Sequence, residues 1–383
     1  VRREGDLISV DGYSCRIYRG ELPTVLVENN QDLQRLLSWA DEVALLQVRA
    51  NAETVKDLTT AINFGAKGVG LARTEHMFFG QERILEMRRL ILADTEDETK
   101  EALSRLLNFQ EEDFYQMFQA VQDKPMIVRL LDPPMHEFLP KDDQDIENLA
   151  KQLKKYPKKL AERIESLQES NPMLGHRGCR LGNTYPEITA MQTRAILGAA
   201  IELKKEGLDP HPEIMVPLTG ILYEFENQEK VIRDTAAALF AEEGVSVDFK
   251  VGTMIEIPRA ALTANRIATR AEYFSFGTND LTQMTFGYSR DDIASFLPVY
   301  LDKKILSVDP FQELDQEGVG QLIRMAVERG RSTRPDLPCG ICGEHGGDPH
   351  SVKFCHHIGL NYVSCSPFRV PIARLSAAQA AIE

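Results

Sequence analysis

Short apolar runs alternate with amphipathic segments along most of the chain, and the runs have the length of buried strands. Eight of them predict strands: 45–51, 68–73, 126–131, 172–177, 214–218, 249–256, 273–277 and 339–342. Each is followed by apolar residues at helical spacing, as in 103–121 and in 222–239 before a stop at Gly244. Eight strand and helix repeats are typical of a closed barrel, so we predict an α/β fold of the (β/α)8 TIM barrel class.

The main alternative to the barrel is an open, doubly wound parallel sheet. Such a sheet more often carries a glycine-rich phosphate loop after an early strand. Neither GxGxxG nor GxxxxGK[ST] occurs in this sequence. The absence of these motifs favours the barrel.

The first residues follow a different pattern. Residues 5–12 and 15–18 alternate in polarity and predict two short strands joined by a turn at Asp11-Gly12. An isolated hairpin is only marginally stable in water. We therefore expect residues 1–24 to be the tail and linker of another domain, and residues 25–383 to form the barrel.

Composition narrows the function classes. The chain has 383 residues, and 43% of them are hydrophobic, which is enough for a large core. Its net charge of −14 disfavours nucleic-acid binding, because the phosphate backbone is also negative. No apolar run approaches the roughly 18 residues that a membrane span requires. Six cysteines are too few for a disulfide scaffold. They favour reduced thiols and an intracellular protein, cytoplasmic or organellar.

Three arginines close predicted strands. Arg73, Arg129 and Arg177 end the second, third and fourth of them, and in a barrel these ends meet at one face. Guanidinium groups bind phosphate and carboxylate oxygens with two parallel hydrogen bonds. Any one arginine could instead pair with a carboxylate of the barrel. Three at equivalent places favour an anion site.

Two carboxylates close the sixth and seventh predicted strands, Glu256 and Asp280. Neighbouring strands lie about 5 Å apart, so both carboxylates can reach one cation. Two carboxylates with waters and substrate oxygens are a usual environment for Mg²⁺. The alternative is a pair of solvated acids, but Glu256 lies within the apolar run 252–257, where an unpaired charge is expensive. We therefore predict a Mg²⁺ site.

Cys339 and Cys342 form a CxxC pair, which raises the question of zinc or redox chemistry. A structural zinc needs four ligands, and the sequence has no second CxxC and no histidine pair with the spacing of a zinc finger. A thioredoxin-like pair would open a helix near the start of the chain. We interpret Cys342 as a proton donor at the barrel mouth. The alternative is a buried structural cysteine.

The residues alone indicate an anion-binding, Mg²⁺-dependent barrel with a thiol acid, without naming its substrate. Five segments, however, resemble the phosphoenolpyruvate- and pyruvate-binding domain of the PEP-utilising enzymes: 70–79, 129–138, 175–182, 274–286 and 340–347. The forms Thr-Glu-His-Met-Phe-Phe and Cys-Gly-Glu-His-Gly-Gly resemble the pyruvate, phosphate dikinase branch more than phosphoenolpyruvate synthase or the first enzyme of the sugar phosphotransferase system.

This resemblance implies a phosphotransferase. In that family an ATP-grasp domain phosphorylates a histidine on a swivelling domain, which then exchanges its phosphoryl group with pyruvate at the barrel. By similarity, Arg73 and Arg129 hold the phosphoryl group, and Arg177 acts on the phosphoryl and enolate oxygens. Cys342 exchanges the C3 proton of the substrate.

The resemblance also assigns the metal and carboxylate sites. It implies that Glu256 and Asp280 hold Mg²⁺. Asn279, with the backbone around Gly277, Thr278 and Asp280, would bind the substrate carboxylate.

The other domains of such an enzyme are not found in this sequence. None of the eight histidines stands in a Thr-Ser-His context, so the resemblance implies an incomplete fragment whose first residues end the swivelling domain. It also implies a homodimer. The alternatives are a natural stand-alone form, a non-catalytic dimerisation or phosphoenolpyruvate-sensing barrel, and the barrel of phosphoenolpyruvate synthase.

Overall fold

Eight parallel strands form a closed barrel in the computed structural model, which describes residues 5–11, 16–23 and 30–383. The strands pair in the order β10-β3-β4-β5-β6-β7-β8-β9. Their bounds are β3 Gln47–Asn51, β4 Val69–Arg73, β5 Pro125–Arg129, β6 His211–Val216, β7 Lys250–Ile255, β8 Phe274–Gly277, β9 Cys339–Cys342 and β10 Tyr362–Cys365. The predicted TIM barrel class is confirmed, and the open doubly wound sheet is excluded.

Seven of the eight predicted strands are present, and the prediction for residues 172–177 was wrong. That segment forms a short 3-10 helix, η4 (Pro172–Leu174), and then a loop. Pro172 has no backbone N–H for a strand ladder, and Gly175 ends the turn with φ −90° and ψ −148°. The strand that the sequence analysis missed is β10, which closes the barrel between β9 and β3.

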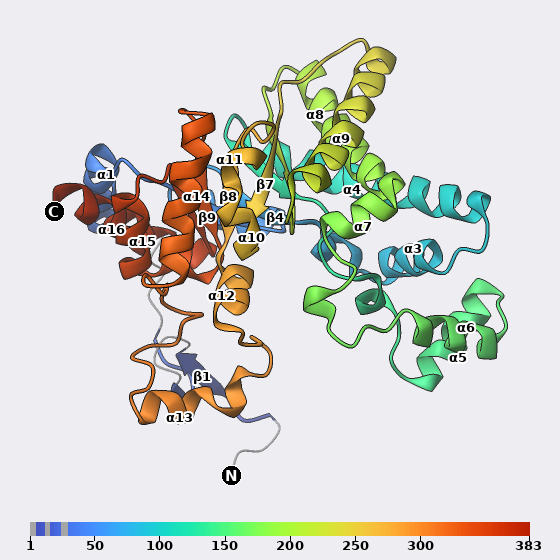
Figure 1. Ribbon diagram of the computed structural model, residues 1–383, viewed down its shortest axis with the longest axis horizontal. Helices are drawn as coiled ribbons and strands as arrows, with labels where there is room; N and C mark the ends of the chain where they lie inside the picture. The colour runs from blue at the N-terminus through green and yellow to red at the C-terminus, as the bar shows by residue number, and fades with distance from the viewer. Residues whose placement is uncertain (1–4, 12–15, 24–29) are drawn as a thin grey trace.

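Helices surround the barrel (Figure 1). They are α1 Gln31–Val43, α2 Val55–Asn63, α3 Gln81–Ile91, α4 Glu96–Val121, α5 Asp143–Leu153, α6 Pro157–Ser166, α7 Cys179–Thr184, α8 Pro186–Lys205, α9 Leu222–Glu243, α10 Pro258–Leu262, α11 Ala264–Ile267, α12 Thr278–Phe286, α13 Leu297–Asp302, α14 Val319–Thr333, α15 Pro349–His357 and α16 Val370–Ile382. The other 3-10 turns are η2 Thr74–Phe78, η3 Met135–Phe138, η5 Ile293–Ser295, η6 Glu344–Gly347 and η7 Pro367–Arg369, and all but η5 follow a strand.

Local sequence signals explain where the long helices begin and end. Thr95 caps α4 by accepting a hydrogen bond from the backbone N–H of Glu98 at 3.2 Å. Helix α9 ends at Gly244, which adopts φ +66°, a conformation that glycine reaches without a steric penalty. The predicted helices at 103–121 and 222–239 are therefore confirmed, including the stop.

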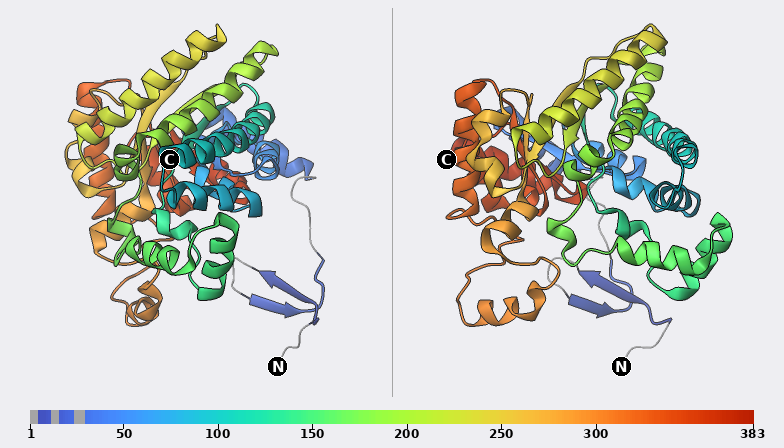
Figure 2. Two further views of the ribbon diagram at one scale, coloured as in Figure 1. Left: turned by 90° about the vertical axis from the view of Figure 1, so that its right-hand side faces the viewer. Right: turned by 45° about the vertical axis from the view of Figure 1, so that its right-hand side comes forward.

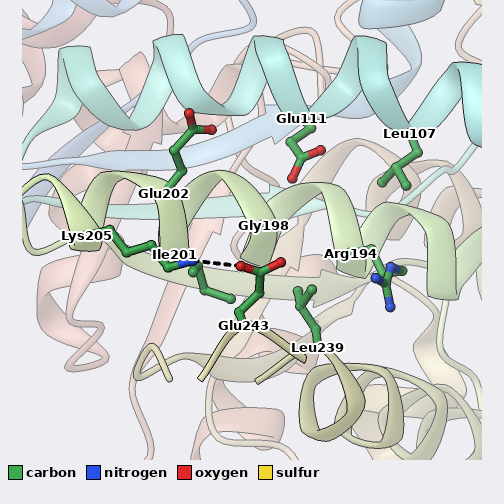
Figure 3. A pocket seen from close by; sticks show the side chains of 9 residues that line it. All are labelled: Leu107, Glu111, Arg194, Gly198, Ile201, Glu202, Lys205, Leu239 and Glu243. Atoms are coloured by element: carbon green, nitrogen blue, oxygen red, sulfur yellow. Dashed lines mark hydrogen bonds and ion pairs between the residues drawn. The ribbon is translucent and has the colours of Figure 1, made fainter. Parts of the chain in front are cut away.

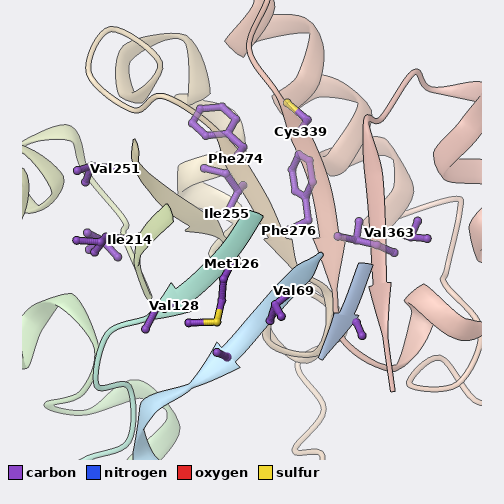
Figure 4. Packing of buried hydrophobic residues seen from close by; sticks show 14 of the residues in the cluster. Val69, Met126, Val128, Ile214, Val251, Ile255, Phe274, Phe276, Cys339 and Val363 are labelled. Atoms are coloured by element: carbon purple, nitrogen blue, oxygen red, sulfur yellow. The ribbon is translucent and has the colours of Figure 1, made fainter. Parts of the chain in front are cut away.

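The outward side chains of the strands form the main core beneath the helices. Figure 4 shows part of it, with Val69, Met126, Val128, Ile214 and Phe274 among the labelled residues. All five are fully buried. Burying each such side chain contributes roughly 1.5–3 kcal/mol, so the outer face of the barrel wall dominates the hydrophobic stabilisation.

The inward side chains fill the barrel itself. A second buried cluster contains Leu71, Ile127, Met215, Met254, Tyr273, Cys342 and Tyr362. Gly252 makes room for one of these rings, because a Cβ atom on it would lie 2.5 Å from the ring of Tyr273. The barrel interior is therefore a packed core below its C-terminal end, and we expect ligands to bind at the mouth.

The predicted hairpin is present. Strand β1 (Ile8–Asp11) pairs antiparallel with β2 (Arg16–Arg19), from Ile8 opposite Arg19 to Asp11 opposite Arg16. Both views of Figure 2 show it standing beside the barrel. Gly12 and Cys15, which belong to the predicted turn and second strand, lie outside the described residues. The assignment of residues 1–24 to another domain stays a prediction.

Within the described ranges, no helix has both the length and the apolar character that crossing a membrane requires.

Candidate functional site

Arg73 and Arg129 lie side by side at the barrel mouth. Each is the last residue of its strand, β4 and β5, and the two are register partners. Arg129 is 8% exposed and pairs with Glu75 through Nη2 and with Asp132 through Nη1 at 3.0 Å. Arg73 is more exposed and pairs with Glu53 at 2.7 Å. Both arginines therefore also make the carboxylate pairs that the alternative interpretation expected.

Arg177 reaches the same place by another route. It lies in the loop between η4 and α7 and does not close a strand, which corrects the sequence prediction. Its Nη2 atom donates to Oδ2 of Asp132 at 2.5 Å and lies 3.6 Å from Oδ2 of Asp280. The loop is held by Gly178, whose N–H donates to the carbonyl of Asp132 at 2.8 Å.

Gly178 is required there for two reasons. Its φ is +58°, and a Cβ atom on it would lie 2.7 Å from the Cβ atom of Leu218. The tight turn aims the neighbouring arginine into the barrel mouth. Arg177 therefore lies at the barrel mouth, as predicted, although the predicted strand that led to it does not exist.

Asp132 links the two buried arginines electrostatically. Burial alone would raise the pKa of Asp132, but Arg129 and Arg177 outweigh it and hold that pKa below its ordinary value. Burial would lower the pKa values of both arginines, yet their carboxylate partners raise them. Both guanidinium groups therefore stay charged at neutral pH. Their Nε atoms have no hydrogen-bond partner among the described residues, so they retain donors for an anion.

Glu256 follows β7 and is completely buried. Its Oε1 atom accepts a hydrogen bond from the backbone N–H of Leu218 at 2.6 Å, and its Oε2 atom has no partner in the described part of the chain. Leu218 adopts φ +60°, a strained conformation for a leucine. The turn at Leu218 thus directs an N–H group at the Glu256 carboxylate.

Asp280 lies in the first turn of α12, directly after β8, and β7 pairs with β8. The two carboxylates therefore follow neighbouring strands, as predicted. These are the fifth and sixth strands of the barrel, because the predicted fourth strand does not exist. Burial and then Asp280 raise the pKa of Glu256 well above its ordinary value, and burial also raises the pKa of Asp280. Two adjacent carboxylates, one buried and one partly exposed, whose negative charges repel each other are a suitable environment for a cation.

The donor set fits a small, hard divalent cation such as Mg²⁺. Carboxylate oxygens are its preferred protein ligands, and the unpartnered Oε2 atom of Glu256 is one. The described residues contain no group of three or more histidine, cysteine or acidic side chains placed to hold a metal ion. A metal would therefore take its remaining ligands from waters and substrate, as Mg²⁺ commonly does.

The junction of β8 and α12 carries the predicted carboxylate-binding residues. Helix α12 begins at Thr278 directly after Gly277, so the first backbone N–H groups of the helix have no partner within it. The Oδ1 atom of Asn279 is buried without a hydrogen-bond partner among the described residues. Thr278 donates to the carbonyl of Cys342 at 3.5 Å, which ties the junction to β9.

Cys342 ends β9 and is 1% exposed. Its Sγ atom accepts a hydrogen bond from Oγ of Ser275 at 3.4 Å, and its S–H donates to the carbonyl oxygen of Phe276, with 3.8 Å between sulfur and oxygen. Burial raises the pKa of the Cys342 thiol to about 11, against the opposing effect of Ser275. The thiol is therefore protonated at neutral pH.

The two cysteines of the CxxC pair face opposite sides of the barrel wall. Cys339 belongs to the outer core, whereas Cys342 belongs to the inner cluster. Both are free thiols. Side chains three positions apart on a strand point to opposite faces, so the pair has the geometry of neither a disulfide nor a shared metal ligand set.

A cavity of about 420 Å³ opens over these residues. Its lining is Arg73, Glu75, His76, Phe79, Arg129, Asp132, Pro133, Pro134, Glu137, Pro172, Met173, Arg177, Asn279, Asp280, Gln283, Arg290 and Asp291. Glu256 and Cys342 are buried and do not line it. The structure thus brings Arg73, Arg129, Arg177, Asn279 and Asp280 to one cavity.

The sequence analysis missed several residues of this site. Glu75 and Asp132 pair with the arginines, and Ser275 supports the thiol. Arg290 lines the cavity, and among the described residues no hydrogen bond or ion pair engages its guanidinium group. Glu75, Asp132 and Ser275 lie inside segments that carry the family resemblance, which was the available signal. Arg290 lies outside all five segments.

A second cavity, of about 370 Å³, lies between α4, α8 and α9 on the outside of the barrel (Figure 3). Lys205 and Glu243 pair across it at 2.7 Å. Burial and the nearby Glu202 raise the pKa of Glu111. None of the predicted site residues lies there.

Comparisons with known proteins identify the family of the chain. The family model described as "PEP-utilising enzyme, PEP-binding domain" matches residues 27–382. Proteins named pyruvate, phosphate dikinase from Clostridium symbiosum and Rhizobium meliloti are 54% and 53% identical over 99% of this chain. The chloroplastic pyruvate, phosphate dikinase 1 of Arabidopsis thaliana is 55% identical over 99% of the chain.

The chain spans 44%, 42% and 40% of the lengths of these three relatives, respectively. The match of the family model covers the whole barrel and every residue of the candidate site. The chain therefore belongs to the family of PEP-binding domains of the PEP-utilising enzymes.

Proposed function

We propose that this barrel carries out the pyruvate and phosphoenolpyruvate half-reaction of a pyruvate, phosphate dikinase. The reaction is a Mg²⁺-dependent exchange of a phosphoryl group between the enolate of pyruvate and a phosphohistidine. The observation that carries the proposal is one continuous chain of charges at the mouth, from Arg129 through Asp132 and Arg177 to Asp280. The names of the relatives support it.

The arginines bind the phosphoryl group. Phosphoenolpyruvate carries close to three negative charges, and Arg129 and Arg177 are fixed, charged and have unpaired Nε donors. Because their carboxylate partners hold them in place, little reorganisation is needed when the anion arrives. Arg73 and Arg290 add positive charge at the more exposed part of the cavity.

Glu256 and Asp280 hold Mg²⁺ in this proposal. When bound, the ion acts as a Lewis acid that stabilises negative charge on substrate oxygens. The support from this chain is the unpartnered Oε2 atom of Glu256 and the raised pKa values of both carboxyl groups. Without a cation, the two carboxylates would also repel the anionic substrate.

The start of α12 binds the substrate carboxylate. Its free backbone N–H groups and the positive end of the helix dipole favour an anion. Asn279 contributes its side-chain amide, and Gly277 lets the substrate approach the backbone. The carboxylate and the phosphoryl group are then held at two ends, which leaves C3 near the barrel axis.

Cys342 moves the C3 proton. In the direction of pyruvate, C3 takes the proton from Sγ, the carbon–carbon π pair becomes the new C–H bond, and a thiolate remains. Ser275 donates a hydrogen bond to that sulfur, and the charge of Arg129 also favours the thiolate. In the direction of phosphoenolpyruvate, the thiolate takes the proton back.

The phosphohistidine comes from a swivelling domain outside the described barrel, and the ATP-grasp domain phosphorylates it. We assign residues 1–24 to the end of that swivelling domain and residues 25–383 to the barrel, and we expect two barrels to associate as a homodimer. The exposed strands β1 and β2 are consistent with a continuation of that domain.

Mixing the two components tests the proposal. The purified chain is incubated with pyruvate, Mg²⁺ and a separately prepared, phosphorylated swivelling domain of a relative, and phosphoenolpyruvate is measured by ³¹P NMR. We expect slow formation of phosphoenolpyruvate, because the tether and its high effective concentration are lost. No product with excess phosphorylated domain would contradict the proposal and favour a binding module.

Turnover of pyruvate with ATP by the chain alone is the matching control. We expect none, because no Thr-Ser-His segment is present. ATP-driven product from the chain by itself would contradict the division of labour between domains.

A further inference from the structure

Met254 lies at the top of the packed barrel interior. It belongs to the inward series Gly252, Met254 and Glu256 on and after β7, and it is 3% exposed. Two residues later on the same inward face comes the proposed metal ligand Glu256. Met254 is therefore the last inward-facing apolar side chain of β7 before the charged mouth.

Met254 and Cys342 lie on the two strands that flank the strand of Ser275. Ser275 is the register partner of Met254 on β8, and it also donates the hydrogen bond to Sγ of Cys342. Met254 and Cys342 belong to the same buried cluster. Met254 therefore lies on the far side of Ser275 from the thiol, and the residue between them is small.

The end of the Met254 side chain lies at the level of the thiol. Gly277 is the register partner of Cys342, and a Cβ atom on Gly277 would lie 2.6 Å from Cε of Met254. The same Cβ atom would also overlap Oε2 of Glu256. The backbone of Gly277 therefore lies against Cε of Met254, which places an apolar methyl group beside the register partner of the thiol.

Resting on the proposed function, we propose that Met254 determines which 2-oxo acid the barrel accepts. In this proposal, the carbon that exchanges its proton with Cys342 has the thiol on one side and Cε of Met254 on the other. A methyl group fits this space, whereas a longer alkyl group at C3 would collide with the thioether. Met254 thus restricts the acceptor to pyruvate by the size of its C3 group. The carboxylate of the acceptor is recognised separately, by charge.

Binding of two ligands that differ by one carbon tests this inference. The ligands are phosphoenolpyruvate and its homologue with a methyl group on C3, titrated into the chain by calorimetry in the presence of Mg²⁺. A hydrophobic pocket discriminates one methylene by about 10- to 200-fold, so we expect wild type to prefer phosphoenolpyruvate within that range. Met254→Ala should reduce the preference to less than about 10-fold, mainly by binding the homologue more tightly.

Two further variants separate size selection from damage to the fold. Met215→Ala removes a methionine of the same buried cluster from β6, which lies three strands away from the strand of Cys342, and it should leave the preference unchanged. Met254→Leu keeps most of the volume but removes Cε, and it should give an intermediate preference even if Met254→Ala does not fold.

The outcomes separate this inference from the proposed function. A wild-type chain that binds the two ligands equally, or Met254 variants that keep the full preference, would contradict the role of Met254 alone. A wild-type chain that binds no phosphoenolpyruvate with Mg²⁺ would contradict the proposed function and this inference with it. An equal loss of preference in Met215→Ala would show that general loosening of the interior, and not Met254, sets the limit.

Discussion

The Oγ atom of Ser275 donates a hydrogen bond to the Sγ atom of Cys342, at 3.4 Å inside the barrel. The two residues come from neighbouring strands, β8 and β9, and are separated by 67 positions in sequence. Ser275 is thus positioned to stabilise a thiolate when Cys342 gives up its proton. The proposed proton transfer depends on this contact.

Replacing the two cysteines of the CxxC pair should separate proton transfer from packing. In the mixture of chain, pyruvate, Mg²⁺ and phosphorylated swivelling domain, NMR in D₂O measures exchange of the methyl protons. Cys342→Ala should lower that exchange roughly 10²- to 10⁴-fold, the usual contribution of a positioned acid or base. Cys339→Ala should keep it, because that thiol faces the outer core. The reverse pattern would show that Cys339, and not Cys342, transfers the proton.

Glu256→Gln should stabilise the metal-free chain at neutral pH and abolish its stabilisation by Mg²⁺. Because the folded state raises the pKa of Glu256, the unfolded chain binds fewer protons there, and stability falls as pH rises through that pKa. Wild type should gain about 2.7 kcal/mol at a Mg²⁺ concentration 100 times Kd. Thermal unfolding with Mg²⁺ and with excess chelator measures both effects. An undiminished Mg²⁺ effect in the variant would remove Glu256 from the metal site.

Glu111→Gln is the matched control for that variant. Burial also raises the pKa of Glu111, but this residue lies in the outer cavity between α4, α8 and α9. The substitution should raise the unfolding temperature at neutral pH, and the gain should disappear as the pH falls below the ordinary glutamate range. The response to Mg²⁺ should stay that of wild type. A changed Mg²⁺ response would show that the effect is not specific to the barrel mouth.

Replacing Arg129 should destabilise the fold more than replacing Arg73, whereas both replacements should weaken substrate binding. Arg129 is buried between Glu75 and Asp132, so Arg129→Met leaves the buried carboxylate of Glu75 without its partner and Asp132 with Arg177 alone, and should cost about 3–5 kcal/mol. Arg73→Met removes a partly exposed pair and should cost at most about 1 kcal/mol. Denaturant unfolding measures the stabilities, and calorimetry measures phosphoenolpyruvate binding, which should weaken in both. Unchanged binding in Arg73→Met would exclude that residue from the phosphoryl site.

The periodic pattern of the chain was sufficient to predict the barrel, because each strand is a short apolar run followed by a helix with its own stop. It failed at residues 172–177, where an apolar run is broken by Pro172 and Gly175. It also missed β10, a run of only four residues that β9 and β3 hold in place from both sides. Pairing across the closed barrel is a property of the whole fold and has no local signal.

The site residues also divide into those that a local pattern in the sequence marks and those whose role depends on distant partners. Glu256 and Cys342 could be found because polar side chains at the ends of apolar strands point to the barrel mouth. Asp132 could not, because its role depends on Arg129 three residues earlier and on Arg177, which arrives from a loop 45 positions later. Partners of this kind become visible only when the loop is placed in space.

Titration of phosphoenolpyruvate into the 383-residue chain, followed by calorimetry with Mg²⁺ and again with excess chelator, tests the central claim most directly. We expect binding with Mg²⁺ and little or none in chelator, because without a cation the carboxylates of Glu256 and Asp280 repel the substrate. Glu256→Gln should weaken the Mg²⁺-dependent binding. Equal affinity in chelator would contradict the proposed metal site, and no binding under either condition would contradict the proposed function of the barrel mouth.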